Sequence, residues 1–478
     1  MLRRLTAASA ALALLLASCS EQPAPDYEPG VSAEARAEGA QQHVRLLAEF
    51  GGEYRGAQQV YLQRIGAQIA AAAGLEGQCT FTLVNSDVVN AFAVPGCYIY
   101  VTRGLMAFVN SEAELASVLG HEVGHIMARH GERQQERSIW SLLGVIAVSL
   151  AGSDRLTQLA SAAAELFTLR YSRTQEYESD ELGIRYLRTA GYDPYAAADM
   201  LDALTRNEAY VTASGSRDAA RSLPEWASSH PLTDKRIERA RGLARQSGLA
   251  DNALPEKREA FLAAVDGLLF GDDPEQGFVI GRRFAHPVMK IGFEAPEGFT
   301  LTNSPQAITL SGPDGIRGEF AGGPIPQGGL RAYVEALVPQ IIGEMQGAAG
   351  SAEESMINGL PAIIVPIRVA TREGELPIWL AAYDAGGGAA YHFVIAAPGG
   401  GAQSAATSRL FASFHRLGAQ EIAALRPREV DVVTVAPGAT ADSIGRSIDP
   451  VKGAALVRAL NGDDAIRPGA RIKIVRAR

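Results

Sequence analysis

The chain has 478 residues, of which 47% are hydrophobic and 20% are charged, and its formal net charge is −9. This length allows two or three domains, and the composition is that of an ordinary folded protein. The acidic balance argues against nucleic acid as a partner, because binding to phosphates needs a surplus of lysine and arginine.

The first residues carry the features of a lipoprotein signal peptide over 1–18. Two arginines precede an apolar run that is too short for a confident membrane-spanning helix. The run ends in Leu-Ala-Ser before Cys19 and resembles a bacterial lipobox, which implies a lipid anchor on Cys19. Since Ser20 rather than aspartate follows, we expect a periplasmic protein anchored in the inner leaflet of the outer membrane. An ordinary secreted protein that is cleaved nearby is the alternative.

Residues 19–32 are rich in proline and acidic residues at their start, and they are predicted to form a tether between the lipid and the fold. Cys79 and Cys97 remain when Cys19 carries the lipid. In an oxidising compartment such a pair can form a disulfide, and two buried free thiols are the alternative.

The first folded stretch has two helical patterns between residues 33 and 74, separated near Gly51. Three strands are then predicted, at 80–84, 88–94 and 98–102, with a Pro-Gly turn before the last.

The most informative stretch is the sequence His-Glu-Val-Gly-His at 121–125. It lies in a predicted helix over 111–130 that has a capping box at its start. On a helix, His121 and His125 lie on one face, where two imidazoles can bind one Zn²⁺. Glu122 lies beside them as a potential general base. A pair of surface histidines on an amphipathic helix is the alternative.

A catalytic zinc needs a third protein ligand. His130 has the wrong spacing and lies off the metal face of the predicted helix, and Glu165 stands alone. Glu176 and Asp180 share one face of a helix predicted over 173–190. The Glu176 carboxylate could reach the metal, and Asp180 could accept the outer N–H of a ligand histidine. A solvated helix face is the alternative for these two acids.

The rest of the first half is mainly helical. Residues 138–153 contain no charged side chain and are short for a membrane span, so we predict a core helix or an apolar lid. A membrane-touching element is the alternative. Further helices are predicted at 156–170, 195–206 and 234–246, with a loop at 209–222.

From about residue 255 the sequence changes to short β-rich runs with two helical patches. We predict a separate α+β domain with an antiparallel sheet over 255–425, and we find no catalytic constellation in it. Residues 430–478 have a β-α-α-β order and resemble a LysM module, the small fold that binds cell-wall glycans.

Several separated motifs resemble the gluzincin metallopeptidases of the HtpX, BepA and CAAX prenyl protease type. In chain order they are NAFAVPG at 90–96, HEVGH, SRTQEYESD at 172–180, and Ser-His-Pro at 229–231 with Arg236. The resemblance covers roughly residues 35–245, and the lipobox favours the BepA-like periplasmic branch.

This resemblance implies one bound zinc ion and assigns its surroundings residue by residue. The three ligands and the base would be His121, His125, Glu176 and Glu122. Asp180 would orient a ligand histidine. His230 would approach the metal, either gating it or stabilising the oxyanion, with a buried structural histidine as the alternative. Substrate would lie along a strand that contains Asn90, Phe92, Ala93 and Val94.

We therefore expect an α+β chain with a mainly helical zincin-type metallopeptidase domain and a small β-sheet over 33–252, followed by the sheet-rich domain and the LysM-like module. The leading hypothesis for function is a zinc-dependent endopeptidase that hydrolyses unfolded or misassembled envelope proteins. A largely latent protease that acts as a chaperone or assembly scaffold is the second. The third is a module, in residues 431–476, that binds peptidoglycan.

Overall fold

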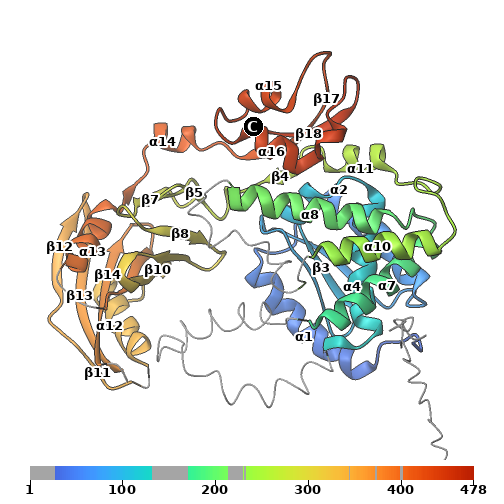
Figure 1. The fold of residues 1–478 in the computed structure, drawn as a ribbon. Coiled ribbons are helices and arrows are strands. Elements are labelled where there is room, and N and C mark those ends of the chain that lie inside the picture. The colour runs from blue at the N-terminus through green and yellow to red at the C-terminus, as the bar shows by residue number, and fades with distance from the viewer. Residues whose placement is uncertain are drawn as a thin grey trace, which may run out of the picture.

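The computed structural model describes residues 27–131, 171–213, 230, 233–343, 345–371, 374–398 and 402–478. Several predicted features lie outside these residues: the signal peptide with Cys19, the apolar run over 138–153, Glu165 and the helix over 156–170. No helix within the described part is both long and apolar enough to cross a membrane. The described elements are a mixture of helices and sheets (Figure 1).

The N-terminal part contains two helices and a small sheet. The helices occupy the predicted positions, at α1 (Ala33–Glu49) and α2 (Ala57–Ala72). The sheet has the order β1 (Thr80–Val84), β3 (Tyr98–Thr102), β2 (Ala91–Val94). β3 pairs with β1 in parallel and with β2 antiparallel, so β2 is an edge strand. The strand predicted from residue 88 begins only at Ala91.

One disulfide and two hydrogen bonds hold the N-terminal part together. Cys79 and Cys97, which precede β1 and β3, form a disulfide, which is one of the two alternatives for this pair. The described end of the predicted tether contacts the fold, because the Val31 N–H donates to Gln78 Oε1 at 3.2 Å and the Tyr27 hydroxyl donates to Glu178. Tyr27 and Val31, at the described end of the predicted tether, are therefore bound to the folded part.

The helical part is built around α4 (Glu112–Met127), which is buried on nearly all sides. It packs against α2 and against the neighbouring helices shown in Figure 1. These are α7 (Arg173–Thr189) and α8 (Ala196–Ala213). Helix α10 (Asp234–Gln246) packs on α7 and α8, and the short helix α3 (Arg103–Phe108) packs on α8. α8 continues beyond its predicted end at residue 206, so the described start of the predicted loop over 209–222 is helical.

The N-terminus of α4 is anchored by a buried carboxylate. Glu112, only 1% exposed, accepts hydrogen bonds from the side chains of Tyr61, Arg64, Lys257 and Tyr192. Burial raises the pKa of Glu112, but these four donors together lower it to about 2. The ionised carboxylate therefore ties the start of α4 to segments far apart in the chain.

The C-terminus of α4 lies earlier than predicted. The helix ends at Met127 rather than at His130, because Arg129 adopts a left-handed conformation with a φ of 51°. This conformation is uncommon for a residue with a side chain. It turns the chain so that the buried His130 side chain returns toward His125.

The crossing of α4 and α7 is unusually close because glycines meet there. A Cβ on Gly183 would lie 2.9 Å from the His121 backbone nitrogen, and a Cβ on Gly124 would lie 3.0 Å from the Ser179 carbonyl oxygen. Both distances are at or below the closest contacts that real Cβ atoms make. The backbones of the two helices are therefore in direct contact.

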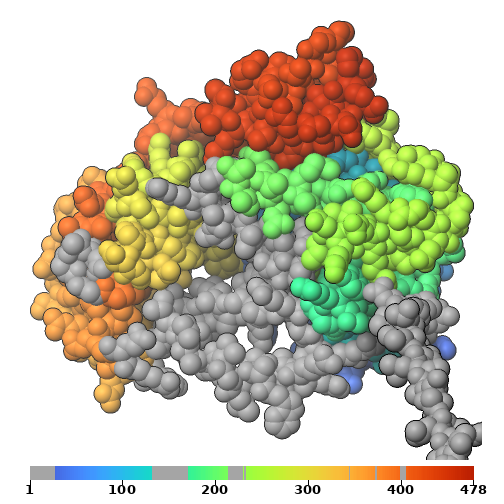
Figure 2. Space-filling model, in the orientation of Figure 1, coloured from blue at the N-terminus to red at the C-terminus, as the bar shows by residue number. Residues whose placement is uncertain are grey.

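The C-terminal module packs on the helical part around α4. Its elements are β17 (Arg428–Thr434), α15 (Ala441–Arg446), α16 (Gly453–Asn461) and β18 (Arg471–Ala477), in the predicted β-α-α-β order. β17 also pairs with β4 (Leu269–Phe270), and α16 packs on α8, where Figure 2 shows continuous contact. Its likeness to a LysM module stays a prediction.

A buried lysine fixes this module in place. Lys473 on β18 is fully buried, and its ammonium group donates to the carbonyl oxygens of Ala107 at 2.7 Å and Val109 at 2.6 Å. These carbonyls lie at the C-terminal end of α3, where helix geometry leaves acceptors without partners. The module and helix α11 (Arg258–Val265) share the core that surrounds α4.

The remaining residues form the sheet-rich part at the left of Figure 1. An eight-stranded antiparallel sheet has the order β11-β13-β14-β15-β10-β9-β8, and β12 also pairs with β13. The strands are β8 (Thr300–Asn303), β9 (Ile308–Ser311), β10 (Arg317–Pro324), β11 (Gly347–Ala349), β12 (Glu353–Ile357), β13 (Leu360–Thr371), β14 (Gly374–Asp384) and β15 (Ala389–Ala396). α12 (Gly329–Ile342) packs on one face.

The other face of this sheet packs against α13 (Ala402–Ser413) and a second, four-stranded sheet. That sheet contains β5 (Phe278–Ile280), β6 (Arg283–His286), β7 (Ile291–Glu294) and β16 (His415–Arg416). A short helix, α14 (Ala419–Ala424), leads on to β17. The sheet-rich part therefore begins near residue 278, with β5 of the four-stranded sheet. Residues 258–270 pack with α4 and the C-terminal module instead.

Replacing Gly183 with alanine tests the close crossing. We expect Gly183→Ala to lower the free energy of unfolding by about 1–3 kcal/mol, because the new methyl group must push α7 away from α4. Urea denaturation would measure this change. Gly242→Ala on α10 is the matched control, since a Cβ there meets nothing within 4 Å. Equal stability of the two variants would contradict the interpretation.

Candidate metal centre

Four buried side chains from three segments converge on one point. They are His121 and His125 of α4, Glu176 of α7, and His230, and each is at most 2% exposed. One ligand atom from each lies within 4.8 Å of the others. Among the described residues, no other group of this kind is found.

The distances within the group are short. His121 Nε2 lies 3.0 Å from His125 Nε2 and 3.2 Å from His230 Nδ1. A carboxylate oxygen of Glu176 lies 2.9 Å from His230 Nδ1, and the two oxygens lie 3.6 Å from the Nε2 atoms of the two helix histidines. The atoms that would coordinate a metal therefore already face one another.

The hydrogen-bond network assigns the tautomers of the two helix histidines. Asp180 Oδ1 lies 2.9 Å from His121 Nδ1, so that nitrogen carries the proton and Nε2 presents a lone pair. Glu178 accepts from His130 Nε2 at 3.0 Å, so His130 Nδ1 accepts from His125 Nδ1 at 2.9 Å. His125 Nε2 then also presents a lone pair.

This donor set fits a zinc ion. Two imidazole lone pairs and a carboxylate repel one another at these distances unless a cation lies between them. Burial lowers the pKa of His125 well below its usual value, and the neighbouring imidazoles lower it further, so the ring stays neutral as a metal ligand requires. Two histidines and one glutamate are a ligand set of known catalytic zinc sites.

Arg236 of α10 compensates the buried carboxylates. Its guanidinium donates twice to Asp180, at 2.9 and 2.7 Å, and lies 2.7 Å from Glu176. Burial raises the pKa values of both acids, but the charge of Arg236 helps to lower them below their usual values. Both acids are therefore ionised.

Three of these surrounding residues were missed by the sequence analysis. His130 was rejected as a ligand, and it is indeed outside the group of four, but it contacts the outer nitrogen of His125. The left-handed conformation of Arg129 brings His130 to His125, and no local sequence pattern predicts that conformation. Glu178 lies in the SRTQEYESD motif, and Arg236 was named with the Ser-His-Pro motif. Both residues were therefore visible in the sequence, but their contacts with His130 and with the two acids were not predicted.

Glu122 lies beside the four converging side chains, and its carboxylate faces His230. Its carboxylate is 1% exposed and lies 3.8 Å from His230 Nε2, and it accepts a hydrogen bond from the backbone N–H of Ala93. Burial raises the pKa of Glu122 to about 7, with opposing contributions from nearby charges. A carboxylate with this pKa can both accept and return a proton near neutral pH.

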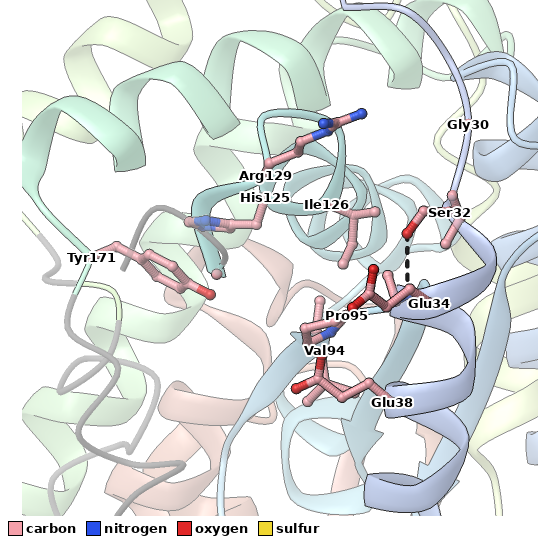
Figure 3. A pocket seen from close by; sticks show the side chains of 15 residues that line it. Gly30, Ser32, Glu34, Glu38, Val94, Pro95, His125, Ile126, Arg129 and Tyr171 are labelled. Carbon is pink, nitrogen blue, oxygen red and sulfur yellow. Dashed lines mark hydrogen bonds between the residues drawn. The ribbon is translucent and has the colours of Figure 1, made fainter. Parts of the chain in front are cut away.

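A cavity of about 310 Å³ opens next to His125 and is shown in Figure 3. Ala93 and Val94 of the edge strand line it, as expected for substrate-binding residues. Phe92 faces away and packs against Phe50 and Tyr100.

Asn90, which was also predicted to bind substrate, is buried and does not line this cavity, and its backbone is hydrogen-bonded to Thr102. Two of the four predicted substrate residues therefore reach the cavity beside the metal centre.

Replacing Asp180 tests the orientation of His121. We expect Asp180→Asn to weaken zinc binding by about 10- to 100-fold, because an amide no longer fixes the proton on His121 Nδ1. Competition with a chromophoric chelator would measure the affinity. The control is Glu181→Gln, the next residue on α7, which pairs with Arg239 away from the centre. Unchanged affinity in Asp180→Asn would refute the assigned role.

Comparisons with known proteins agree with this geometry over part of the chain. The beta-barrel assembly-enhancing protease of Yersinia pestis is 32% identical over 197 residues, which cover 39% of each protein. The protease of the same name from Escherichia coli strain K12 is 30% identical over 198 residues, again 39% of each. The mitochondrial metalloendopeptidase OMA1 of Arabidopsis thaliana is 32% identical over 204 residues, 42% of this chain and 38% of that protein.

The chain thus spans well under half the length of the curated relatives that it matches. Solved structures match weakly: the cyanobacterial PsbP of Synechocystis has 11% identity and a TM-score of 0.24, over 28% of this chain and 91% of that chain. A score this low carries no argument. The model of peptidase family M48 matches residues 56–244, which contain all the side chains of the candidate metal centre. Residues 56–244 of the chain are therefore similar to peptidase family M48.

Proposed function

We propose that the protein is a zinc-dependent endopeptidase whose ligands are His121, His125 and Glu176. The single observation that supports this most strongly is the pair of inward-facing Nε2 lone pairs, 3.0 Å apart and next to a buried carboxylate. Zinc in such a site supplies a Lewis acid that activates water and polarises the scissile carbonyl group.

Glu122 is the proposed general base. Its Oε1 atom has no hydrogen-bond partner among the described residues, so it is free to accept a proton from the attacking water. The same carboxylate then gives that proton to the departing amine. A pKa near 7 suits both steps, and the hydrogen bond from the Ala93 N–H keeps the carboxylate beside the edge strand.

The proposed substrate is an extended segment of an unfolded or misassembled protein. Within the described part of the chain β2 pairs only with β3, so its outer edge can take another extended chain beside the metal centre. A folded protein cannot offer such a segment, because its backbone groups are already paired. This requirement supports a role in quality control of envelope proteins.

The proposed location is the periplasmic face of the outer membrane, with a lipid anchor on Cys19. The support comes from the lipobox and from the disulfide between Cys79 and Cys97, a bond that persists in oxidising compartments. Peptidoglycan remains a proposed partner of residues 431–476. Retention of the purified protein by peptidoglycan sacculi in a pull-down would test that contact.

Exchanging the base tests the peptidase proposal. We expect Glu122→Gln to lower the rate of casein hydrolysis at least 100-fold while zinc stays bound, because the amide cannot accept a proton. Gel-based proteolysis and metal analysis of the same samples would measure both. The wild-type protein treated with a chelator and then resupplied with zinc is the control. Cleavage that persists in Glu122→Gln and in chelator would overturn the proposal.

A second candidate function is a largely latent protease that acts as a chaperone or assembly scaffold. His230 favours it, because its Nδ1 atom lies within 3.2 Å of both His121 and Glu176 and so completes a group of four. A closed set of four ligands leaves no open position for water, as in structural zinc sites.

Complementation separates the two candidates. If the protein acts mainly as a peptidase, we expect Glu122→Gln to fail to restore growth under envelope stress in cells that lack the gene. Full rescue by this variant, at wild-type protein levels on an immunoblot, would instead support the scaffold.

A further inference from the structure

The cavity beside the metal centre has one acidic wall. Glu34 and Glu38 lie four residues apart on α1, so they share one face of that helix, and both line the cavity together with Val94. In Figure 3 the two glutamates lie on the α1 side of the cavity, across from His125 and Tyr171.

This wall is held firmly at the end of the edge strand. A Cβ on Gly39 would lie 2.1 Å from the Pro95 carbonyl oxygen, and a Cβ on Gly96 would lie 2.6 Å from the Ala35 carbonyl oxygen. Helix α1 therefore rests directly on the turn between β2 and β3. The two carboxylates are fixed next to the strand along which the substrate is proposed to lie.

The acidic wall carries charge that the described residues do not neutralise. Glu34 and Glu38 are exposed, and within the described ranges no ion pair reaches either of them. Glu38 accepts one hydrogen bond, from Gln42 Nε2 at 3.0 Å. Arg129 also lines the cavity, but Figure 3 shows Ile126 between it and the glutamates. Two like charges one turn apart repel each other and favour a cation between them.

A second observation indicates that the cavity takes a polar ligand. Tyr171 is 9% exposed, and its ring stacks on His125 with 3.9 Å between the ring centres. Figure 3 shows its hydroxyl directed into the cavity, and this hydroxyl has no hydrogen bond to any described residue. The hydroxyl oxygen is exposed to the cavity rather than enclosed by protein atoms, so it can bond to a group that binds there. A main-chain group of a bound peptide would supply such a partner.

We propose that this cavity is a substrate subsite that selects a basic side chain. Glu34 and Glu38 bind the ammonium group of a lysine, or the guanidinium group of an arginine, in a peptide that lies along β2. The volume of about 310 Å³ is at the lower end of small-ligand pockets, which suits one long side chain. This inference rests on the proposed peptidase function and adds a class of substrate to it.

Matched peptides test the preference. Pairs of quenched fluorescent peptides would carry either lysine or glutamine at one position, scanned over three positions on each side of the scissile bond. At one position we expect kcat/KM for lysine to exceed that for glutamine by about 3- to 10-fold, since exposed ion pairs contribute modestly. The preference should shrink as sodium chloride is raised, because exposed charges are screened.

Variants of the wall assign the preference to it. In the double variant Glu34→Gln/Glu38→Gln we expect the ratio of kcat/KM for lysine to that for glutamine to fall to about 1, with little change in cleavage of the glutamine peptide. In the double variant Glu34→Lys/Glu38→Lys we expect the glutamine peptide to be preferred. Glu76→Gln, an exposed acid outside the cavity, is the control and should keep the wild-type ratio. A wild-type enzyme without a lysine preference at any position, or a preference that survives in the double glutamine variant, would overturn the inference.

Binding separates this inference from the peptidase proposal. Fluorescence anisotropy with Glu122→Gln protein measures the affinity for the same labelled peptides without cleavage. If the wild type cleaves nothing but the lysine peptide binds tighter and loses this advantage in the double glutamine variant, the subsite stands and the peptidase proposal fails. Equal binding of both peptides removes the subsite.

Discussion

The metal centre depends on how closely α4 and α7 pass each other. Helices that meet through ordinary side chains lie about 8–10 Å apart. Here Gly120, Gly124 and Gly183 remove the side chains at the crossing, and the backbones touch. Glu176 and Asp180 precede Gly183 by about two turns and one turn, respectively, on the same face of α7, so this contact brings both carboxylates to the imidazoles of α4. Because Gly124 lies inside the HEVGH motif, the motif supplies two of the proposed ligands and also the helix contact that brings the proposed third ligand to them.

The same contact buries charge, which has to be compensated. Glu122, Glu176 and Asp180 lie together and are almost completely buried, and uncompensated carboxylates in such places are costly. Arg236 offsets part of this charge through its two hydrogen bonds to Asp180 and its contact with Glu176. One arginine cannot balance three acids when all are ionised, so the centre is a favourable place for a divalent cation. The arrangement that positions the ligands also provides the driving force for filling the site.

Local patterns were sufficient where structure depends on neighbouring residues. The strand at 80–84 and the helix at 234–246 have the predicted bounds, because alternation and capping are contained in a few positions. Contacts between segments that are far apart in the chain could not be predicted from such local patterns. Arg129 has no local signal for its left-handed turn, and the turn alone brings His130 to the centre. Lys473 lies in an alternating strand, and its acceptors are more than 360 residues away.

A chain of polar contacts leads from the metal centre to the N-terminal segment. His125 donates to His130, which donates to Glu178, and the same carboxylate accepts from the hydroxyl of Tyr27. Tyr27 lies within residues 19–32, which are predicted to tether the fold to its lipid. His125 carries its proton on Nδ1, and its Nε2 lone pair therefore faces the proposed metal position. Glu178 fixes this arrangement through His130, and the same carboxylate binds Tyr27 near the start of the described chain. The N-terminal segment at Tyr27 and the hydrogen-bond chain that sets the tautomer of His125 therefore share one acceptor, Glu178.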